Sequence, residues 1–257
     1  MSKTKAVIAA KPVVAARNIV KELGQGAAMV RALKGVTIEI NPGELTLLMG
    51  PSGSGKTTLL SILGCILSPT SGEVEIAGEA TAGLGPEGLA DIRRRHIGFV
   101  FQSYNLFPTL TALENVRLAL DVRGMKYAET VVRAETALTE VGLSHRLRSY
   151  PGTMSGGEQQ RVAVARALAS APSIILADEP TAALDSENGH AVMALLAELA
   201  KEESRAVLAV THDPRTHAYA DRILKIEDGQ IIGDERPADS GDNVMRYDRK
   251  KRRKQNA

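Results

Sequence analysis

Apolar residues along the chain follow two patterns, short continuous runs and runs with helical spacing. Continuous runs are typical of buried strands, and they occupy residues 45–49, 97–101, 173–177 and 206–210. Apolar positions at helical spacing predict helices over about residues 56–66, 158–169 and 188–201, the last with Val192, Leu195, Leu196 and Leu199 inward. Strands that alternate with helices predict an α/β core with a largely parallel sheet.

Other segments depart from this alternation. Residues 36–40 and 73–77 alternate apolar and polar side chains, which predicts an antiparallel side sheet. The pair Asp228-Gly229 stands between two short strand-like segments and predicts a hairpin turn. We interpret the helical stretch between about residues 103 and 153 as an insertion whose apolar face carries Val131, Ala134, Leu138 and Val141.

The charge of the chain is concentrated in its tail. Of the 257 residues, 44% are hydrophobic and 24% are charged, and the net charge is +2. Residues 246–254 hold seven positive side chains and one negative one, a local charge of +6, which leaves −4 for the rest of the chain. The positive net charge therefore comes from the tail alone, and we expect no nucleic-acid partner for the rest of the chain.

Signals for membrane insertion and for disulfides are weak. No run of roughly eighteen apolar residues occurs, so we expect no membrane-spanning helix. The apolar start of the chain ends at Lys11-Pro12, too early for a signal peptide. Cys65 stands alone and cannot form an intramolecular disulfide, so we expect a cytosolic chain.

A glycine-rich loop joins the first buried run to the first predicted helix. The segment Gly50-Pro51-Ser52-Gly53-Ser54-Gly55-Lys56-Thr57 matches the phosphate-binding loop pattern in full. Its glycines let backbone N–H groups surround phosphate oxygens, and the helix N-terminus adds partial positive charge. Lys56 can reach the β and γ phosphates, and the Thr57 hydroxyl can bind Mg²⁺. We therefore predict a nucleotide site, to which Thr58 also belongs.

Two adjacent carboxylates, Asp178 and Glu179, end the apolar run over residues 173–177. Two acids at a strand end are usually only solvated, and alone they do not indicate a site. Beside a phosphate-binding loop, however, a buried parallel strand places such acids at the nucleotide edge. We therefore predict that Asp178 organises the metal ion and that Glu179 is the base that polarises the attacking water.

A second glycine pair opens the helix predicted after residue 157. The segment Ser155-Gly156-Gly157-Glu158 offers a hydroxyl and free N–H groups, and so a second anion site. Standing alone it is better interpreted as an ordinary N-cap. A simple P-loop enzyme needs only one phosphate cradle, but a dimer uses two if each chain's second cradle closes over the other chain's nucleotide.

Together these segments resemble the ATP-binding cassette (ABC) transporter ATPases over about residues 13–235. Residues 154–158 resemble the family's signature motif, and residues 182–185 resemble its D-loop. Gln102 is placed like the Q-loop glutamine, and His212 like the switch histidine. The resemblance implies a P-loop (RecA-like) α/β core with an antiparallel β side sheet, and an α-helical subdomain inserted at about residues 103–157. For the basic tail, residues 236–257, we expect disorder.

The resemblance also implies a mechanism that uses ATP and Mg²⁺. Two copies form a head-to-tail dimer, with two ATP molecules held between the phosphate loop of one copy and Ser155 to Glu158 of the other. The implied catalytic residues are Glu179, His212, which contacts the γ-phosphate, and Gln102, which touches Mg²⁺ or the lytic water. Thr57 and Asp178 are the other implied metal ligands, and Asp185 couples the two sites.

The chain has only eight aromatic residues, and four of them lie within residues 99–107. Phe99 and Phe101 flank Val100 in the predicted strand, so we expect both to point to the same face, in the core. Two interpretations stay open for Tyr104 and Phe107. They pack within the helical subdomain, or they form the groove that receives a coupling helix of a transmembrane permease.

One feature departs from the family pattern. No aromatic residue precedes Phe99, and Leu23 stands roughly where the family usually has a tyrosine that stacks on adenine. We expect adenine to pack instead on aliphatic side chains near residues 23–30. Because stacking on a base contributes about 1–3 kcal/mol, we predict weak base selectivity.

The sequence segments at residues 51–60, 176–181, 211–213 and 220–222 look most like those of the macrolide-export, lipoprotein-release and heterocyst-glycolipid-export branch. This implies an exporter or mechanotransmission system with a permease and possibly a membrane-fusion protein. The cassette would then lie at the cytoplasmic face of the inner membrane, peripheral through its permease. Alternatives are a polar amino acid importer cassette, a soluble non-transport ABC protein, and a non-hydrolysing cassette, against which Glu179 and His212 argue. The basic tail is either simply solvated or attracted to anionic lipid.

Overall fold

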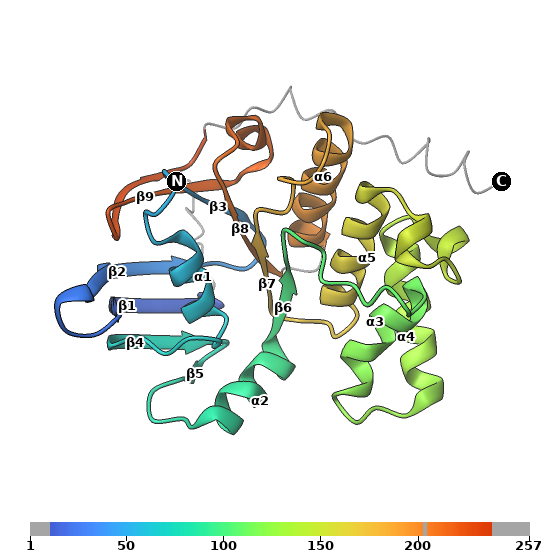
Figure 1. The fold of residues 1–257 in the computed structure, drawn as a ribbon, viewed down its shortest axis with the longest axis horizontal. Helices are drawn as coiled ribbons and strands as arrows, with labels where there is room; N and C mark the ends of the chain where they lie inside the picture. The colour runs from blue at the N-terminus through green and yellow to red at the C-terminus, as the bar shows by residue number, and fades with distance from the viewer. Residues whose placement is uncertain (1–10, 203–204, 238–257) are drawn as a thin grey trace, which may run out of the picture.

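The structure, a computed structural model, describes residues 11–202 and 205–237 (Figure 1). Within these residues there are two sheets, one of six strands in the order β10-β9-β3-β8-β7-β6 and one of four in the order β2-β1-β4-β5. All but the first two residues of the predicted basic tail lie outside the described ranges. In the described part of the chain, no helix is both long enough and apolar enough to cross a membrane.

The elements follow one another in a strand–helix alternation that is interrupted by a helical stretch. The strands are β1 (Val14–Leu23), β2 (Val30–Ile40), β3 (Leu45–Met49), β4 (Ser71–Ile76), β5 (Glu79–Ala80), β6 (Ile97–Val100), β7 (Ile174–Asp178), β8 (Ala206–Thr211), β9 (Arg222–Glu227) and β10 (Gln230–Glu235). The α-helices are α1 (Lys56–Leu63), α2 (Pro86–His96), α3 (Ala112–Asp121), α4 (Tyr127–Glu140), α5 (Gly156–Leu168) and α6 (Ser186–Glu202). Short 3₁₀ segments are η1 (Gly26–Ala28), η2 (Ser144–Arg146), η3 (Pro151–Thr153) and η4 (Pro214–Tyr219).

The six-stranded sheet is parallel except at one edge. The strands β6, β7, β8, β3 and β9 pair in parallel, and β10 returns antiparallel to β9. The return is the predicted two-residue turn, in which Asp228 has φ 47° and Gly229 has φ 75°, the left-handed pair that a type I′ hairpin requires. The predicted parallel core and antiparallel side sheet are both confirmed.

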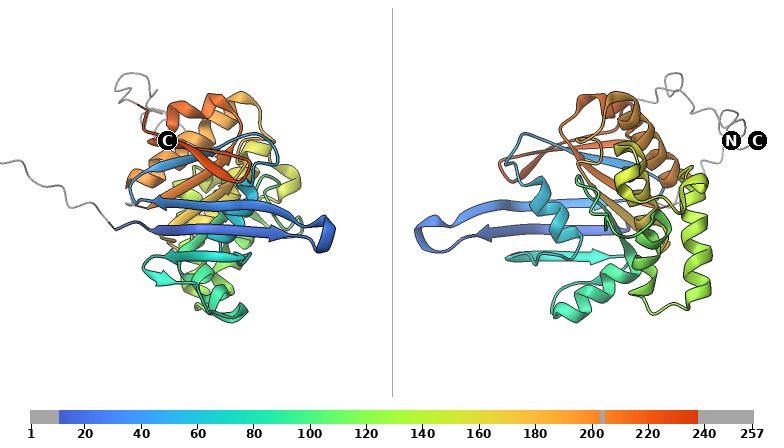
Figure 2. Two further views of the ribbon diagram at one scale, coloured as in Figure 1. Left: turned by 90° about the vertical axis from the view of Figure 1, so that its left-hand side faces the viewer. Right: turned by 45° about the vertical axis from the view of Figure 1, so that its right-hand side comes forward.

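Alternate residues of the parallel strands face two separate cores. On one face Leu47, Ile175 and Ala209 pack with the residues of α3 to α6. On the other face Leu48, Leu176 and Leu208 pack with α1, α2 and the four-stranded sheet. Figure 1 shows this division, with α1 and the side sheet on one side of the parallel strands and α3 to α6 on the other. The β1–β2 hairpin extends away from the rest of the molecule (Figure 2).

Several predicted element ends were wrong by a few residues. The helix predicted to reach residue 66 ends at Leu63, because Cys65 adopts a left-handed backbone with φ 55°. The strand predicted to reach residue 101 ends at Val100. The helix predicted from residue 158 begins at Gly156, since Ser155 caps it. The helix α2 and the strand β1 were not predicted.

The predicted inward faces were mostly correct. All four apolar residues assigned to the inward face of α6 are buried. In α4, Ala134 and Leu138 are buried but Val131 is only partly so, and Thr130 takes the buried position instead. The rings of Phe99 and Phe101 stack with centroids 5.4 Å apart, so they do share a face, although both are only partly buried.

Candidate functional site

The predicted site residues follow four parallel strands that end at the same edge. Met49 pairs with Thr211, Asp178 pairs with Val210, and Val100 pairs with Ala177. The carboxyl ends of β3, β6, β7 and β8 are therefore neighbours, and their following loops share one edge of the sheet. In open α/β sheets this is the edge at which ligands bind.

The loop after β3 needs glycine at two places for close packing. Gly55 has φ 100° and caps α1 from the left-handed region, and a Cβ there would lie 2.7 Å from the carbonyl oxygen of Ala32. A Cβ on Gly50 would lie 2.0 Å from the carbonyl oxygen of Ile226. The loop is thus folded tightly between β2 and β9, with the N-terminus of α1 at its end.

Lys56 is buried and its ammonium group is held by the loop itself. Its Nζ donates to the carbonyl oxygens of Gly50, at 2.8 Å, and of Pro51, at 2.7 Å. The Ser54 hydroxyl is buried and has no hydrogen-bond partner. A buried cation and an unpartnered hydroxyl within one loop form a site suited to an anion such as a phosphate group.

Asp178 and Thr57 come together although they are far apart in the sequence. The Thr57 hydroxyl hydrogen-bonds the Asp178 carboxylate, and Lys56 lies close enough to act on its charge. Burial, together with the neighbouring Glu179 charge, raises the pKa of Asp178 despite these two partners. The buried Oδ1 of Asp178 has no hydrogen-bond partner. Hydroxyl and carboxylate oxygens are the ligands that Mg²⁺ prefers, so these residues fit such an ion.

Glu179 and His212 form a hydrogen-bonded pair. Glu179 Oε1 lies 2.8 Å from His212 Nδ1, and the Glu179 side chain is largely shielded while that of His212 is exposed. Glu179 has φ 46°, a left-handed conformation that is rare for this residue type and typical of functional sites. Its backbone N–H donates to Val210 O at 3.0 Å, which fixes this conformation at the end of β7.

The segment from Ser155 to Glu158 caps α5. The Ser155 hydroxyl accepts from the backbone of Glu158 at 3.2 Å, and Glu158 Oε2 accepts from the backbone of Ser155 at 2.8 Å, which is a capping box. Glu158 also accepts from Arg146 Nε at 2.8 Å. Although burial raises the pKa of Glu158, the bonds from Ser155 and Arg146 outweigh it and lower that pKa. The Ser155 segment is thus an N-cap in this chain.

Residues 182–185, which resemble the D-loop, lie against this segment. Asp185 accepts from the backbone N–H of Asn188 at 2.9 Å and from its side-chain amide at 2.7 Å, and these bonds lower the pKa of Asp185. A Cβ on Gly157 would lie 2.2 Å from Asn188 Oδ1, and one on Gly156 would lie 2.9 Å from the Tyr104 hydroxyl. Both glycines therefore permit close approach of other segments.

The phosphate loop and the Ser155 segment are not brought together. The helix α1 packs in the core on one face of the parallel sheet, and α5 packs in the core on the other. The two helices therefore begin on opposite faces, as Figure 1 shows. Gln102 is exposed in the loop after β6, which continues into the left-handed pair Tyr104 and Asn105.

Several residues that shape this region were not predicted from the sequence. Arg166 donates to the carbonyl oxygens of Tyr104 and Asn105 and so holds the left-handed turn after Gln102. Gln160 donates to Pro180 O at 2.8 Å and so fixes the chain after Glu179. Arg146 binds Glu158. None of these contacts is local in sequence, so no short motif marks them.

Comparison with known proteins identifies the same family as the motifs. The family described as ABC transporter matches residues 33–182. The macrolide export ATP-binding/permease protein MacB of Shigella boydii is 43% identical over 221 residues, which are 86% of this chain and 34% of that protein. MacB of Marinobacter nauticus is 44% identical over 224 residues, 87% of this chain and 35% of that protein. This chain thus spans about a third of the length of these curated relatives.

Solved structures give the same result. A dimeric structure of a post-hydrolysis state of the ATP-binding cassette MJ0796 bound to ADP and Pi matches with a TM-score of 0.79 and 45% identity. The match covers 87% of this chain and 98% of that one. The structure of cbiO1 from Clostridium perfringens, part of the ABC transporter complex cbiONQ, matches with a TM-score of 0.79 at 28% identity, covering 88% and 89% of the two chains.

Proposed function

Since this chain belongs to the ABC transporter family, as one of its ATPase cassettes, we propose that it dimerises around two ATP molecules and drives a membrane permease. The observation that carries this proposal is the shared edge at which Lys56, Asp178, Glu179 and His212 follow neighbouring parallel strands. A buried cation, a metal-binding acid and a paired base at one edge are the parts that phosphoryl transfer to water requires.

We propose that the phosphate loop binds the β and γ phosphates. The backbone N–H groups at the start of α1 and the Ser54 hydroxyl donate to phosphate oxygens. The Lys56 ammonium group gives up its hydrogen bonds to the two loop carbonyls and donates to phosphate oxygens instead. Thr57, Asp178 and the Gln102 amide would hold Mg²⁺. When bound, that ion neutralises charge on the phosphate oxygens.

We propose that Glu179 is the general base. It accepts a proton from water while the water oxygen bonds to the γ-phosphorus and the bond from that phosphorus to the bridging oxygen breaks, which leaves ADP and phosphate. His212, at 2.8 Å from Glu179, holds the carboxylate in place and turns its other ring nitrogen toward the γ-phosphate.

We propose that the second anion site, Ser155 to Glu158, serves the partner copy. Because α1 and α5 begin on opposite faces of the sheet, the Ser155 segment lies away from the phosphate loop of its own chain. A head-to-tail dimer closes this segment over the other chain's nucleotide, with Asp185 at the contact. The dimeric MJ0796 structure supports this arrangement by similarity.

We propose an exporter or mechanotransmission role at the cytoplasmic face of the inner membrane. The similarity to MacB, described as an export ATP-binding/permease protein, favours export over import. The permease, and a membrane-fusion protein where the system has one, would be separate partners or further parts of a longer chain. We assign residues 13–235 to the ATPase domain and about 103–157 to its inserted helical subdomain. For the basic tail both alternatives stand, a solvated extension or attraction to anionic lipid at about 1 kcal/mol per basic residue.

Permease coupling is proposed at Phe107. Phe107 is 52% exposed, yet its backbone is fixed, because the buried Asn115 side chain accepts from Phe107 N at 2.7 Å and donates to Phe107 O at 3.1 Å. A rigid loop that presents a large ring suits a contact that transmits motion. Phe107→Ala is expected to abolish stimulation of ATP hydrolysis by the co-purified permease and to leave basal hydrolysis unchanged. Tyr127→Ala, which removes an exposed ring from α4, is the control, and equal stimulation in all three proteins would refute the coupling role.

Base selectivity is proposed to be weak. Leu23, Met29 and Val30 are exposed at the end of the β1–β2 hairpin, and β2 continues from there to Leu33, whose side chain reaches Gly55 of the phosphate loop. An aliphatic surface gives the base contact area without stacking. GTP is expected to be hydrolysed within about tenfold of the rate for ATP, and Leu23→Tyr to lower the KM for ATP by about tenfold. A hundredfold preference of the natural protein for ATP would rule out this account.

A further inference from the structure

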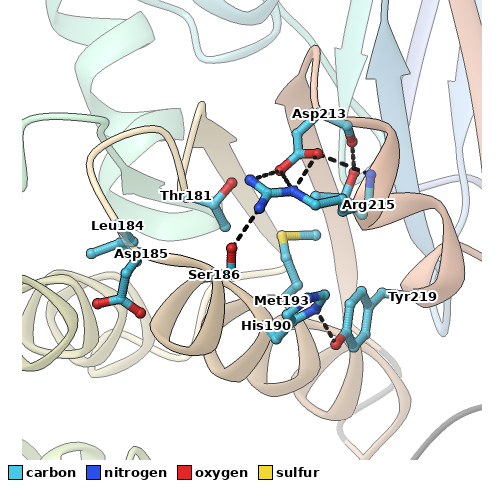
Figure 3. Close-up of a pocket in the computed structure, with 11 residues that line it drawn as sticks. Thr181, Leu184, Asp185, Ser186, His190, Met193, Asp213, Arg215 and Tyr219 are labelled. Carbon is cyan, nitrogen blue, oxygen red and sulfur yellow. Dashed lines mark hydrogen bonds and ion pairs between the residues drawn. The ribbon is translucent and has the colours of Figure 1, made fainter.

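The short segment that follows His212 is fastened to the helix that follows Asp185. Figure 3 shows η4 lying along the first turns of α6. Arg215 Nη1 donates to the Ser186 hydroxyl at 2.6 Å, and the Tyr219 hydroxyl lies 3.0 Å from His190 Nδ1. Ser186 is the first residue of α6 and directly follows Asp185. Two hydrogen bonds therefore connect η4 and α6, the elements that follow two of the proposed site residues.

The Arg215 guanidinium is oriented before it reaches Ser186. Its Nε lies 2.9 Å from each carboxylate oxygen of Asp213, and its Nη2 lies 2.8 Å from Oδ2. Asp213 also accepts from the backbone N–H of Arg215 at 2.9 Å and so caps η4. With Nε and Nη2 fixed on Asp213, the planar group directs Nη1 toward Ser186 (Figure 3).

Two buried side chains line the small pocket between η4 and α6 below this contact. Thr216 is 3% exposed and donates to Asp213 O at 2.7 Å. Met193, on α6 beneath the contact, is 1% exposed. The position of η4 on α6 is therefore set by the hydrogen bonds from Arg215 and Tyr219.

We infer that Arg215 is a positioning residue that couples the loop of His212 to the loop of Asp185. The inference rests on the proposed function of those two residues. The connected groups run from Glu179 to His212 at 2.8 Å, along the backbone to Arg215, and from Arg215 to Ser186 beside Asp185. A partner chain that contacts Asp185 thereby sets the position of His212, and with it the orientation of the Glu179 carboxylate.

The contact acts through geometry and adds little to stability. The Arg215 side chain is 59% exposed, and ion pairs at exposed sites contribute little to folding. Arg215 is no part of the phosphate loop, so the affinity for ATP is not expected to depend on it. Its loss should therefore lower the turnover number while the KM for ATP and the thermal stability stay nearly constant.

The test is a double-mutant cycle on ATP hydrolysis by the full chain. Arg215→Ala and Ser186→Ala are each expected to lower kcat by about tenfold, with the KM for ATP within about twofold and Tm within about 2 °C. The double variant should be no slower than either single variant, and Ser186→Thr, which keeps the hydroxyl, should retain the natural kcat. Arg133→Ala, which removes an exposed arginine paired with Glu129 on α4, is the control.

The outcomes separate this inference from the proposed function. Natural protein that binds ATP but does not hydrolyse it would overturn the proposed function, and the inference with it. Active natural protein whose Arg215→Ala variant keeps its kcat would overturn the inference alone. So would effects of the two substitutions that multiply in the double variant, because independent losses show that the two side chains do not act together.

Discussion

Glu179→Gln is expected to lower the ATP turnover number by about a thousandfold while ATP still binds. A general base contributes about 10² to 10⁴ to the rate, and glutamine keeps the size and polarity of the side chain but cannot accept the proton. The left-handed backbone of Glu179 and its hydrogen bond to His212 place the carboxylate at the end of β7 beside Asp178. Steady-state phosphate release at saturating Mg²⁺ and ATP measures the loss.

The control for this variant is Glu129→Gln, which changes an exposed glutamate on α4 that pairs with its helix neighbour Arg133. It should hydrolyse ATP at the natural rate. If Glu179→Gln also turns over at the natural rate, Glu179 is not the base. If it fails to bind ATP, the side chain acts in binding and the proposed division of roles is incorrect.

Lys56→Ala is expected to weaken nucleotide binding by about a hundredfold or more. Lys56 is 8% exposed and its ammonium group already makes two short bonds to loop carbonyls, so it is fixed where phosphate oxygens would replace them. Hydrogen bonds to charged groups contribute about 1.5–3 kcal/mol each, and two of them correspond to at least this factor. Titration with a fluorescent ATP analogue measures the affinity.

Lys34→Ala is the matched control for that titration. Lys34 lies on β2 and pairs with Asp228 in the turn after β9, near the phosphate loop but outside it. The control should bind the analogue like the natural protein. Equal affinities in all three proteins would show that the nucleotide binds elsewhere.

The sequence was most informative where the pattern is local. The strand β3 was predicted with its observed bounds, because an apolar run before a glycine-rich loop has one interpretation. The two-residue turn at Asp228-Gly229 follows from the backbone conformation that hairpins need. The strand β1 was missed because shifts in its register against β2 break the regular alternation of apolar and polar residues.

The same distinction between local and long-range features holds for the residues of the candidate site. Sequence motifs predicted four of its residues, because each lies directly at a strand end or a helix start: Lys56, Thr57, Asp178 and Glu179. The residues that orient these side chains were not predicted from the sequence. Arg166, Asn115 and Arg215 act through hydrogen bonds to segments that only the fold brings near. Such side chains are ordinary polar positions in the sequence, so their roles depend on tertiary structure.

The proposed mechanism requires two chains to come together when ATP is bound, and the molar mass of Glu179→Gln in Mg²⁺ and ATP measures this dimer. Light scattering on the size-exclusion peak should rise from the 27.4 kDa of one chain to twice that value. Adding Ser155→Arg, which blocks the second anion site at an exposed position, should return the mass to that of one chain while ATP remains bound. A Glu179→Gln protein that binds ATP and stays at 27.4 kDa would show that ATP does not join two chains around the nucleotide.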